Sequence, residues 1–311
     1  MSERNIGVLV MSYGTPENMD RIEAYYTHIR RGRPPSPEML RELVARYEAI
    51  VGGVFPLRAN TDRQVRALQR LLDERHPGRR YVCYQGLKHA TPFIEDGIDA
   101  MAGDSITEGV GIVLAPHYSV MSVGGYIRRA REQAEKRGIR MRFVESYHLH
   151  PLLIEAFSAR LRDALARAGD GGGRGVWVIF TAHSLPEKIV ELNDPYPAQL
   201  LETARAVGEA AGAAEWQFAW QSAGRTDEKW LGPDILDVLQ RLAGESPGDA
   251  VVIAPIGFVS DHLEILYDID IEAKRLAGEL GIRLERTASL NDDPLFIRAL
   301  AECVENAAGG L

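Results

Sequence analysis

The chain has 311 residues, of which 45% are hydrophobic and 26% charged, and its formal net charge is −8. This composition is typical of one large or two ordinary globular domains, and the acidic balance disfavours nonspecific binding to nucleic acid or to an anionic membrane. The two cysteines, Cys83 and Cys303, exclude a disulfide framework, a four-cysteine zinc site and a cysteine-ligated iron–sulfur cluster within the chain. The N-terminus shows no signal peptide, and no apolar run reaches the ~18 residues of a membrane span, so we expect a cytoplasmic protein.

Apolar runs of strand length alternate with longer amphipathic stretches along the chain. The predicted strands are 6–11, 80–85, 111–115, 141–145, 176–181, 215–220, 251–255 and 283–287. Amphipathic helices are predicted over 61–74, 153–167 and 199–211. Continuous apolar strands that alternate with helices indicate an α/β fold with parallel sheets buried on both faces.

The chain also repeats part of itself. Residues 11–17 (MSYGTPE) resemble residues 181–187 (TAHSLPE), and each segment directly follows an apolar strand. Two similar halves predict two doubly wound lobes, 1–168 and 176–311, with a ligand crevice outside the carboxyl ends of the strands and the last helix free to pack back on the first lobe. The glycine-rich stretch 169–175 is the predicted connection.

The turn after the first strand has no nucleotide-binding pattern. It reads Ser12-Tyr13-Gly14-Thr15-Pro16 and lacks G-x-G-x-x-G, and no Walker A sequence occurs elsewhere in the chain. These absences argue against nicotinamide and ATP chemistry.

Three carboxylates, Glu264, Asp268 and Glu272, stand four residues apart. On a helix, side chains at this spacing share one face, where like charges repel by roughly 0.2–0.5 kcal/mol per pair. Bases appear only after the row, at Lys274 and Arg275, whereas an ordinary solvated face would intersperse them. The spacing alone leaves two interpretations open, a solvated helix face and a track for a cation or for protons.

His183 follows the strand 176–181 and is the sharpest single candidate. An imidazole that faces the carboxylates would bind a borderline divalent metal and accept protons. A histidine after a strand is more often a capping or packing residue, and Ser184 with Glu187 has the spacing of a helix N-cap and its N3 partner.

Arginines and tyrosines gather in the segment 25–33 (YYTHIRRGR) and again at Arg46 and Tyr47. One interpretation is an ordinary helix end with basic residues, which the helix dipole favours. The other is a binding surface for a flat polyanion, with aromatic rings for its plane and guanidinium forks for its carboxylates.

These residues lie in segments that resemble the ferrochelatase family, in particular the coproporphyrin type found in bacteria. The segments, in the family's order over nearly the whole chain, are MSYGTP, YYTHIRRGR, RYEAI, GLKHATPFIED, APHYS, TAHSLPEKI, DPYP, WQS, WLGPD and PIGFVSDHLEILYDIDIE. The resemblance implies two Rossmann-like lobes without a nucleotide and a porphyrin bound between them, into which ferrous iron is inserted.

The resemblance also assigns roles to individual residues. His183 and Glu264 are expected to bind the metal and to accept the pyrrole protons, and Asp268 and Glu272 to form an accessory track. Tyr13 is expected on the opposite face of the ring, as an axial ligand of the product iron. The expected propionate-binding or ring-lining residues are Arg30, Arg46, Tyr47 and Tyr126.

The expected substrates are therefore coproporphyrin III and Fe²⁺, with no permanently bound cofactor and no iron–sulfur cluster. We expect a monomer that makes at most transient contact with adjacent haem-pathway enzymes and binds no nucleic acid. Where the coproporphyrin type has a small serine, this chain has Val54-Phe55 and one extra residue, which puts one propionate contact in doubt. The rival hypotheses are a chelatase for protoporphyrin IX or another metal and tetrapyrrole, and a non-enzymatic porphyrin or haem carrier.

Overall fold

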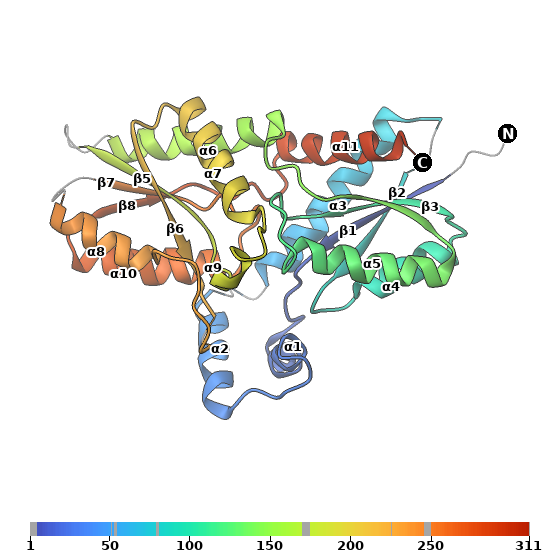
Figure 1. Ribbon diagram of the computed structural model, residues 1–311, viewed down its shortest axis with the longest axis horizontal. Coiled ribbons are helices and arrows are strands. Elements are labelled where there is room, and N and C mark those ends of the chain that lie inside the picture. Colours follow the sequence, from blue (N-terminus) through green and yellow to red (C-terminus); the bar gives the residue numbers. More distant parts are fainter. Residues whose placement is uncertain are drawn as a thin grey trace. The chain divides into compact units, whose positions relative to one another are not determined.

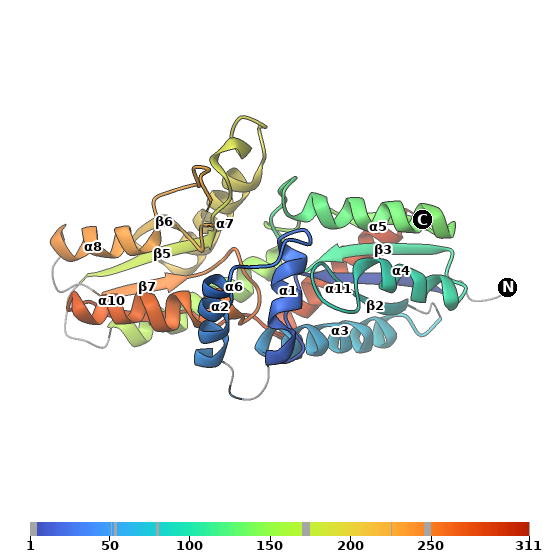
Figure 2. The ribbon, with the colours of Figure 1, turned by 90° about the horizontal axis from the view of Figure 1, so that it is seen from below.

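The protein is described by a computed structural model that covers residues 5–50, 52, 55–78, 81–169, 175–224, 226–245 and 250–310. Contacts divide the chain into two units, residues 1–147 with 291–311 and residues 148–290. Figures 1 and 2 show the ribbon from two sides.

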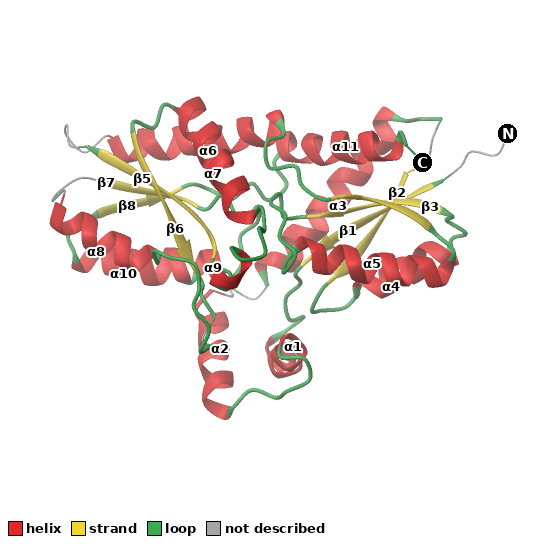
Figure 3. Ribbon diagram, viewed as in Figure 1, coloured by secondary structure: helices red, strands yellow, loops and turns green. Residues whose placement is uncertain are grey.

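The first unit contains a four-stranded parallel sheet in the order β2-β1-β3-β4. Its strands are β1 (Ile6–Ser12), β2 (Tyr81–Leu87), β3 (Glu108–Val113) and β4 (Arg140–Val144). Its helices are α1 (Ile22–Ile29), α2 (Pro37–Ile50), α3 (Pro56–Arg75), α4 (Ile94–Gly103), α5 (Val123–Arg137) and α11 (Pro294–Ala308), and Met19–Arg21 forms a 3₁₀ turn. Helices α4 and α5 cover one face of the sheet, while α3 and α11 cover the other (Figure 3).

The second unit repeats this topology, with the strand order β6-β5-β7-β8. Its strands are β5 (Val176–His183), β6 (Glu215–Gln221), β7 (Ala250–Ala254) and β8 (Arg283–Arg286). Its helical segments are α6 (Pro151–Gly169), the 3₁₀ turn Glu187–Ile189, α7 (Tyr196–Ala211), α8 (Ile235–Glu245), α9 (Leu263–Leu266), the π-helical turn Asp268–Ala273 and α10 (Lys274–Glu279). Because β1 and β5 occupy equivalent positions, the two related heptapeptides of the sequence begin at the ends of equivalent strands and continue into the loops after them.

All eight predicted strands are present, and the three predicted helices lie within α3, α6 and α7. The largest displacement concerns β3, predicted at 111–115 but observed from Glu108. Gly109 and Gly111 lie near its start. Both are sites of close packing, since a Cβ at Gly111 would lie 2.5 Å from the Phe143 ring.

The observed division of the chain differs from the predicted lobes 1–168 and 176–311. Helix α6 packs against α7, β7 and β8, so it belongs to the second unit and the crossing lies at Tyr147 and His148. Helix α11 packs against α3, β3 and β4 and completes the first unit. The glycine-rich stretch therefore connects α6 with β5 within one unit, and its residues 170–174 lie outside the described part of the chain.

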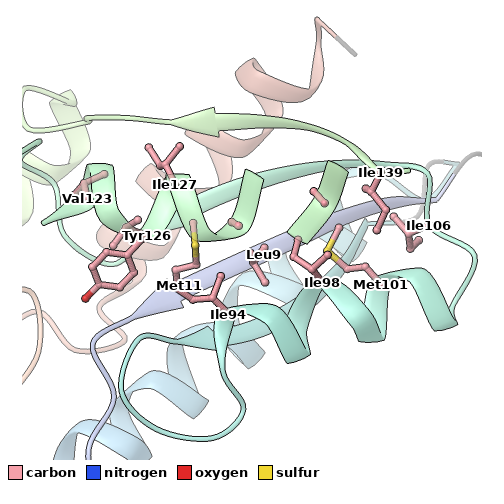
Figure 4. Packing of buried hydrophobic residues seen from close by; sticks show 13 residues of the cluster. Leu9, Met11, Ile94, Ile98, Met101, Ile106, Val123, Tyr126, Ile127 and Ile139 are labelled. Carbon is pink, nitrogen blue, oxygen red and sulfur yellow. The ribbon is translucent and has the colours of Figure 1, made fainter. Parts of the chain in front are cut away.

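The core of the first unit lies between β1 and the pair α4 and α5 (Figure 4). Leu9 and Met11 from the strand meet Ile94 and Ile98 from α4 and Ile127 from α5. These side chains repeat every second residue on the strand and every third or fourth on the helices, which is the reason the segments form these elements. No helix in the described ranges is both long and apolar enough to cross a membrane.

Candidate active site

His183 and Glu264 come together at the carboxyl ends of two adjacent strands of the second unit. His183 is the last residue of β5, and Glu264 lies in α9, which follows β7. Strand β5 lies between β6 and β7, so the chain order reverses at the β5–β7 pair, and ligands of doubly wound sheets bind at such a switch point. The Nε2 atom of His183 is 3.5 Å from Oε1 of Glu264, and each side chain keeps about a third of its surface exposed.

Close packing at Gly257 allows the loop after β7 to approach the end of β5. A Cβ atom at Gly257 would lie 2.4 Å from the Cβ of Ala182 and 2.7 Å from its Cα, and the Gly257 amide donates to the carbonyl of Thr181 at 3.1 Å. Only glycine fits there without moving the two backbones apart. This approach brings the segment that carries Glu264 beside His183.

Hydrogen bonds from buried polar side chains hold the backbone of His183 and Glu264 in place. The Gln221 side chain accepts a hydrogen bond from the Thr181 hydroxyl and donates to the Glu264 carbonyl, both at 2.8 Å. The Tyr196 hydroxyl donates to the His183 carbonyl at 3.1 Å. Gln221 is only 1% exposed, so a displacement of Glu264 would leave the buried Gln221 side-chain amide without a hydrogen-bond acceptor. This cost opposes movement of Glu264.

The charges of His183 and Glu264 support each other. Burial by itself would lower the pKa of His183, but the Glu264 carboxylate, the Ser184 carbonyl and Asp268 raise that pKa to about 9. Burial would raise the pKa of Glu264, but His183 and His262 hold it well below its usual range. His262 lies on the other side of the carboxylate, with Nε2 3.6 Å from Oε2 and Nδ1 2.9 Å from the Ser260 carbonyl. Glu264 therefore lies between two imidazoles.

The spacing predicted that the carboxylate row lies on one regular α-helix, but the structure differs from this prediction. Helix α9 ends at Leu266, and in the π turn that follows the Glu272 amide donates to the Tyr267 carbonyl five residues earlier. A step of four residues is slightly more than one full turn of an α-helix and slightly less than one full turn of a π-helix. The rotations about the helix axis from Glu264 to Asp268 and from Asp268 to Glu272 therefore have opposite directions.

Asp268 and Glu272 have different surroundings. Asp268 is 8% exposed and accepts a hydrogen bond from the Ser222 hydroxyl at 2.5 Å. Ser222 has a φ of 58°, a conformation that costs a non-glycine residue about 1–2 kcal/mol. Glu272 is half-buried.

The predicted helix start at Ser184 is wrong. The Ser184 amide donates to the Gln221 carbonyl and the Ser184 hydroxyl donates to the Leu231 carbonyl.

Among the described residues, no three His, Cys, Asp or Glu side chains form a ready-made metal cage. His183 and Glu264 offer two ligands on an open pair of strand ends. A closed site of four ligands holds a structural metal, whereas an ion that must leave for another ligand needs free coordination positions.

The remaining predicted residues belong to the first unit, where Tyr13 follows β1 and is exposed. Its ring lies 4.7 Å from the ring of His89, whose Nδ1 is 3.0 Å from Nδ1 of His28. Burial and nearby cations lower the pKa of His89 to about 3. The Lys88 ammonium lies 6.0 Å from the Tyr13 ring centre and 4.8 Å from that of Tyr126. Lys88 thus joins Tyr13 and Tyr126, two of the three predicted tyrosines, into one patch of rings and cations.

Of the predicted arginines, Arg30 directly follows α1 and Arg46 lies on α2. The Arg30 guanidinium is 5.8 Å from the Tyr26 ring centre, and its Nε donates to the Arg33 carbonyl at 3.3 Å. Arg46 is half-buried on α2.

Tyr47 is only 4% exposed, and its hydroxyl is 3.4 Å from that of Thr15. Its ring packs 5.1 Å from that of Phe55, whereas Val54 lies outside the described part of the chain. Tyr47 therefore supports the loop after β1 within its unit.

Several residues that surround His183 and Glu264 in the second unit, or Tyr13 in the first, were not predicted. They are His262, Gln221, Ser222, Lys88 and His89. Each lies in a segment that already carried the resemblance, namely SDHLE, WQS or GLKH. Spacing could not reveal them, because their roles depend on contacts with other strands.

The family model for ferrochelatase matches residues 5–308. The chain belongs to the ferrochelatase family. A coproporphyrin III ferrochelatase of Anoxybacillus flavithermus is 47% identical over 307 residues, which cover 98% of this chain and 97% of that protein. A coproporphyrin III ferrochelatase of Bacillus subtilis is 46% identical over 310 residues, 99% of this chain and all of that protein.

A solved structure shares the fold of this ferrochelatase-family chain. It is the sirohydrochlorin chelatase of Bacillus subtilis subspecies spizizenii in complex with cobalt, with a TM-score of 0.59 over 99% of this chain and 96% of that one. The two sequences are 11% identical, so the likeness concerns the fold alone.

Proposed function

We propose that the protein inserts ferrous iron into coproporphyrin III and releases Fe-coproporphyrin III, as a step of haem biosynthesis. The observation that carries this proposal is the His183–Glu264 pair at the switch point of the second sheet. Family membership and the names of the full-length relatives support the same reaction.

The reaction exchanges two pyrrole N–H protons for one Fe²⁺ ion, so the site must hold a cation and accept protons. His183 offers an imidazole, which binds borderline metals through its neutral form and can take up a proton. Glu264, 3.5 Å away, favours the protonated form of His183, so the imidazole must release this proton before it binds the metal. Asp268 and Glu272 continue as a path for protons or hydrated metal.

We assign the first unit to the tetrapyrrole. Tyr13 is exposed and would ligate the product iron, while Arg30 and Arg46 would hold propionates. Tyr126 is 4% exposed, so it would contribute a ring edge, and Tyr47 would act through the Tyr13–Thr15 loop that it supports.

No resident cofactor is needed for this exchange, and we propose that the protein works without an iron–sulfur cluster. Burial raises the pKa of both Cys83 and Cys303 to about 12, which disfavours the thiolates that ligate iron. Free thiols and Fe²⁺ both require a reducing compartment, so we place the reaction in the cytoplasm.

The test is anaerobic Fe²⁺ insertion by the purified protein, followed by absorbance, with coproporphyrin III and protoporphyrin IX in parallel. We expect faster turnover of coproporphyrin III. It has four propionates whereas protoporphyrin IX has two, so it can form more ion pairs with the arginines of the first unit. Faster turnover of protoporphyrin IX would keep the reaction class and overturn the substrate. Binding of both porphyrins without metallation would make the protein a carrier.

The substitution Arg46→Ala is expected to weaken coproporphyrin III binding by ~1.5–3 kcal/mol, because a charge-assisted hydrogen bond to a propionate would be lost. Fluorescence quenching of the porphyrin measures this affinity. Arg41→Ala on the same helix removes an equal charge from an exposed position and is the matched control. Equal affinities of the two variants would remove Arg46 from the site.

A further inference from the structure

One guanidinium joins both ends of the segment that carries the proposed metal ligand. Arg286, the last residue of β8, donates from Nε and from a terminal nitrogen to the two carboxylate oxygens of Asp270, at 2.7 and 2.8 Å. The same terminal nitrogen lies 3.5 Å from Oδ1 of Asp261. Asp261 in turn accepts a hydrogen bond from the Ser289 hydroxyl at 2.8 Å.

Asp261 and Asp270 enclose His262, Glu264 and Asp268 in the sequence. Within this interval lie a four-residue helix and the start of a π turn. A helix of one turn is not stable on its own, and a π turn is less favourable than a regular α turn. The position of Glu264 therefore depends on contacts with the rest of the unit, and besides the Gln221 hydrogen bond Arg286 supplies one contact at each end of the segment.

The geometry of this contact favours a fixed arrangement over a mobile one. The Arg286 side chain is only 15% exposed, and its second terminal nitrogen donates to the Thr287 carbonyl at 2.9 Å. A planar fork that binds two carboxylate oxygens sets direction as well as distance, which a lysine ammonium cannot do.

We propose that Arg286 is a positioning residue for metal insertion: by holding Asp261 and Asp270, it sets the place of Glu264 opposite His183. This inference rests on the proposed function. If Arg286 had a purely structural role, its replacement would lower the stability of the fold and leave the metal affinity and metallation rate of the folded protein unchanged. If Arg286 is a positioning residue, its replacement lowers the metal affinity and the metallation rate of the folded protein.

The test compares Arg286→Lys with Arg137→Lys. Arg137 on α5 makes the same two-pronged contact with Asp99 on α4, at 2.8 and 2.8 Å, in the other unit. Both substitutions keep the charge and remove the fork. We expect Arg286→Lys to lower kcat/KM for Fe²⁺ at least about tenfold while the KM for coproporphyrin III stays within about twofold, and Arg137→Lys to change neither.

Two further readouts separate this inference from the proposed reaction. Without porphyrin, the affinity for Co²⁺ should fall about tenfold in Arg286→Lys, and amide hydrogen exchange should accelerate over residues 262–272. If the wild-type protein metallates no porphyrin, the proposed function fails, and the Co²⁺ affinity still decides whether Arg286 positions the ligands.

Kinetics are compared at a temperature where near-ultraviolet circular dichroism shows every variant folded. Should Arg286→Lys not fold, Asp270→Asn replaces it and Asp99→Asn becomes its control, since these remove the partner carboxylates of the same two contacts. Metal affinity and metallation that match those of the control variant would overturn the proposal.

Discussion

Replacement of His183 by alanine is expected to lower the rate of iron insertion by about 10³-fold. The variant loses both the imidazole ligand and the proton acceptor that faces Glu264 at 3.5 Å. Porphyrin binding should remain within about twofold, because the contacts assigned to the tetrapyrrole lie in the first unit. Single-turnover absorbance measures the rate, and fluorescence quenching measures the affinity.

A matched control exists in the same unit. His148 pairs with Glu202 at 2.8 Å between the start of the unit and α7, so His148→Ala also removes one histidine from one carboxylate. It should metallate at nearly the wild-type rate. Normal metallation by His183→Ala would remove that residue from the reaction.

The substitution Glu264→Gln is expected to lower the metallation rate by about 10²-fold and to lower the pKa of His183. In the wild-type protein the carboxylate holds that pKa at about 9, against the effect of burial. Without the carboxylate, burial is opposed only by the Ser184 carbonyl and Asp268, so the pKa should fall well below about 9. Titration of the His183 ring by NMR, in the absence of metal and porphyrin, measures the change, and an unchanged pKa would contradict the assigned pair.

The same pair makes stability depend on pH in a definite direction. A raised histidine pKa stabilises the fold fully below the unfolded value of ~6.5, and this contribution is lost as pH rises through about 9. The lowered pKa of Glu264 stabilises the fold above ~4.3 and loses that contribution as pH falls. The unfolding free energies of the wild type and Glu264→Gln, measured with urea, should therefore differ most near pH 5–6, and the difference should shrink as pH rises through about 9.

The residue pattern was sufficient for the strands and for the repeat, because burial of both faces of a parallel sheet requires continuous apolar runs that the sequence shows directly. The pattern also made His183 and Glu264 candidates, since each follows an apolar strand and carboxyl ends of parallel strands meet at one edge, but their roles came only from the family resemblance. Pattern failed at Ser184, where the N-cap spacing was satisfied but the hydroxyl and amide bind carbonyls of other segments.

The sequence by itself determined the α/β class and the family, and it singled out His183 and Glu264 as the main candidate site residues. Only the tertiary structure decided that α6 belongs with the second sheet, because its helical period does not say which sheet it covers. Only the structure placed His262, Gln221 and Ser222 around the carboxylates, and Arg286 at both ends of their segment. Periodicity reports which face of an element is apolar, whereas hydrogen bonds between elements depend on how strands distant in sequence are paired.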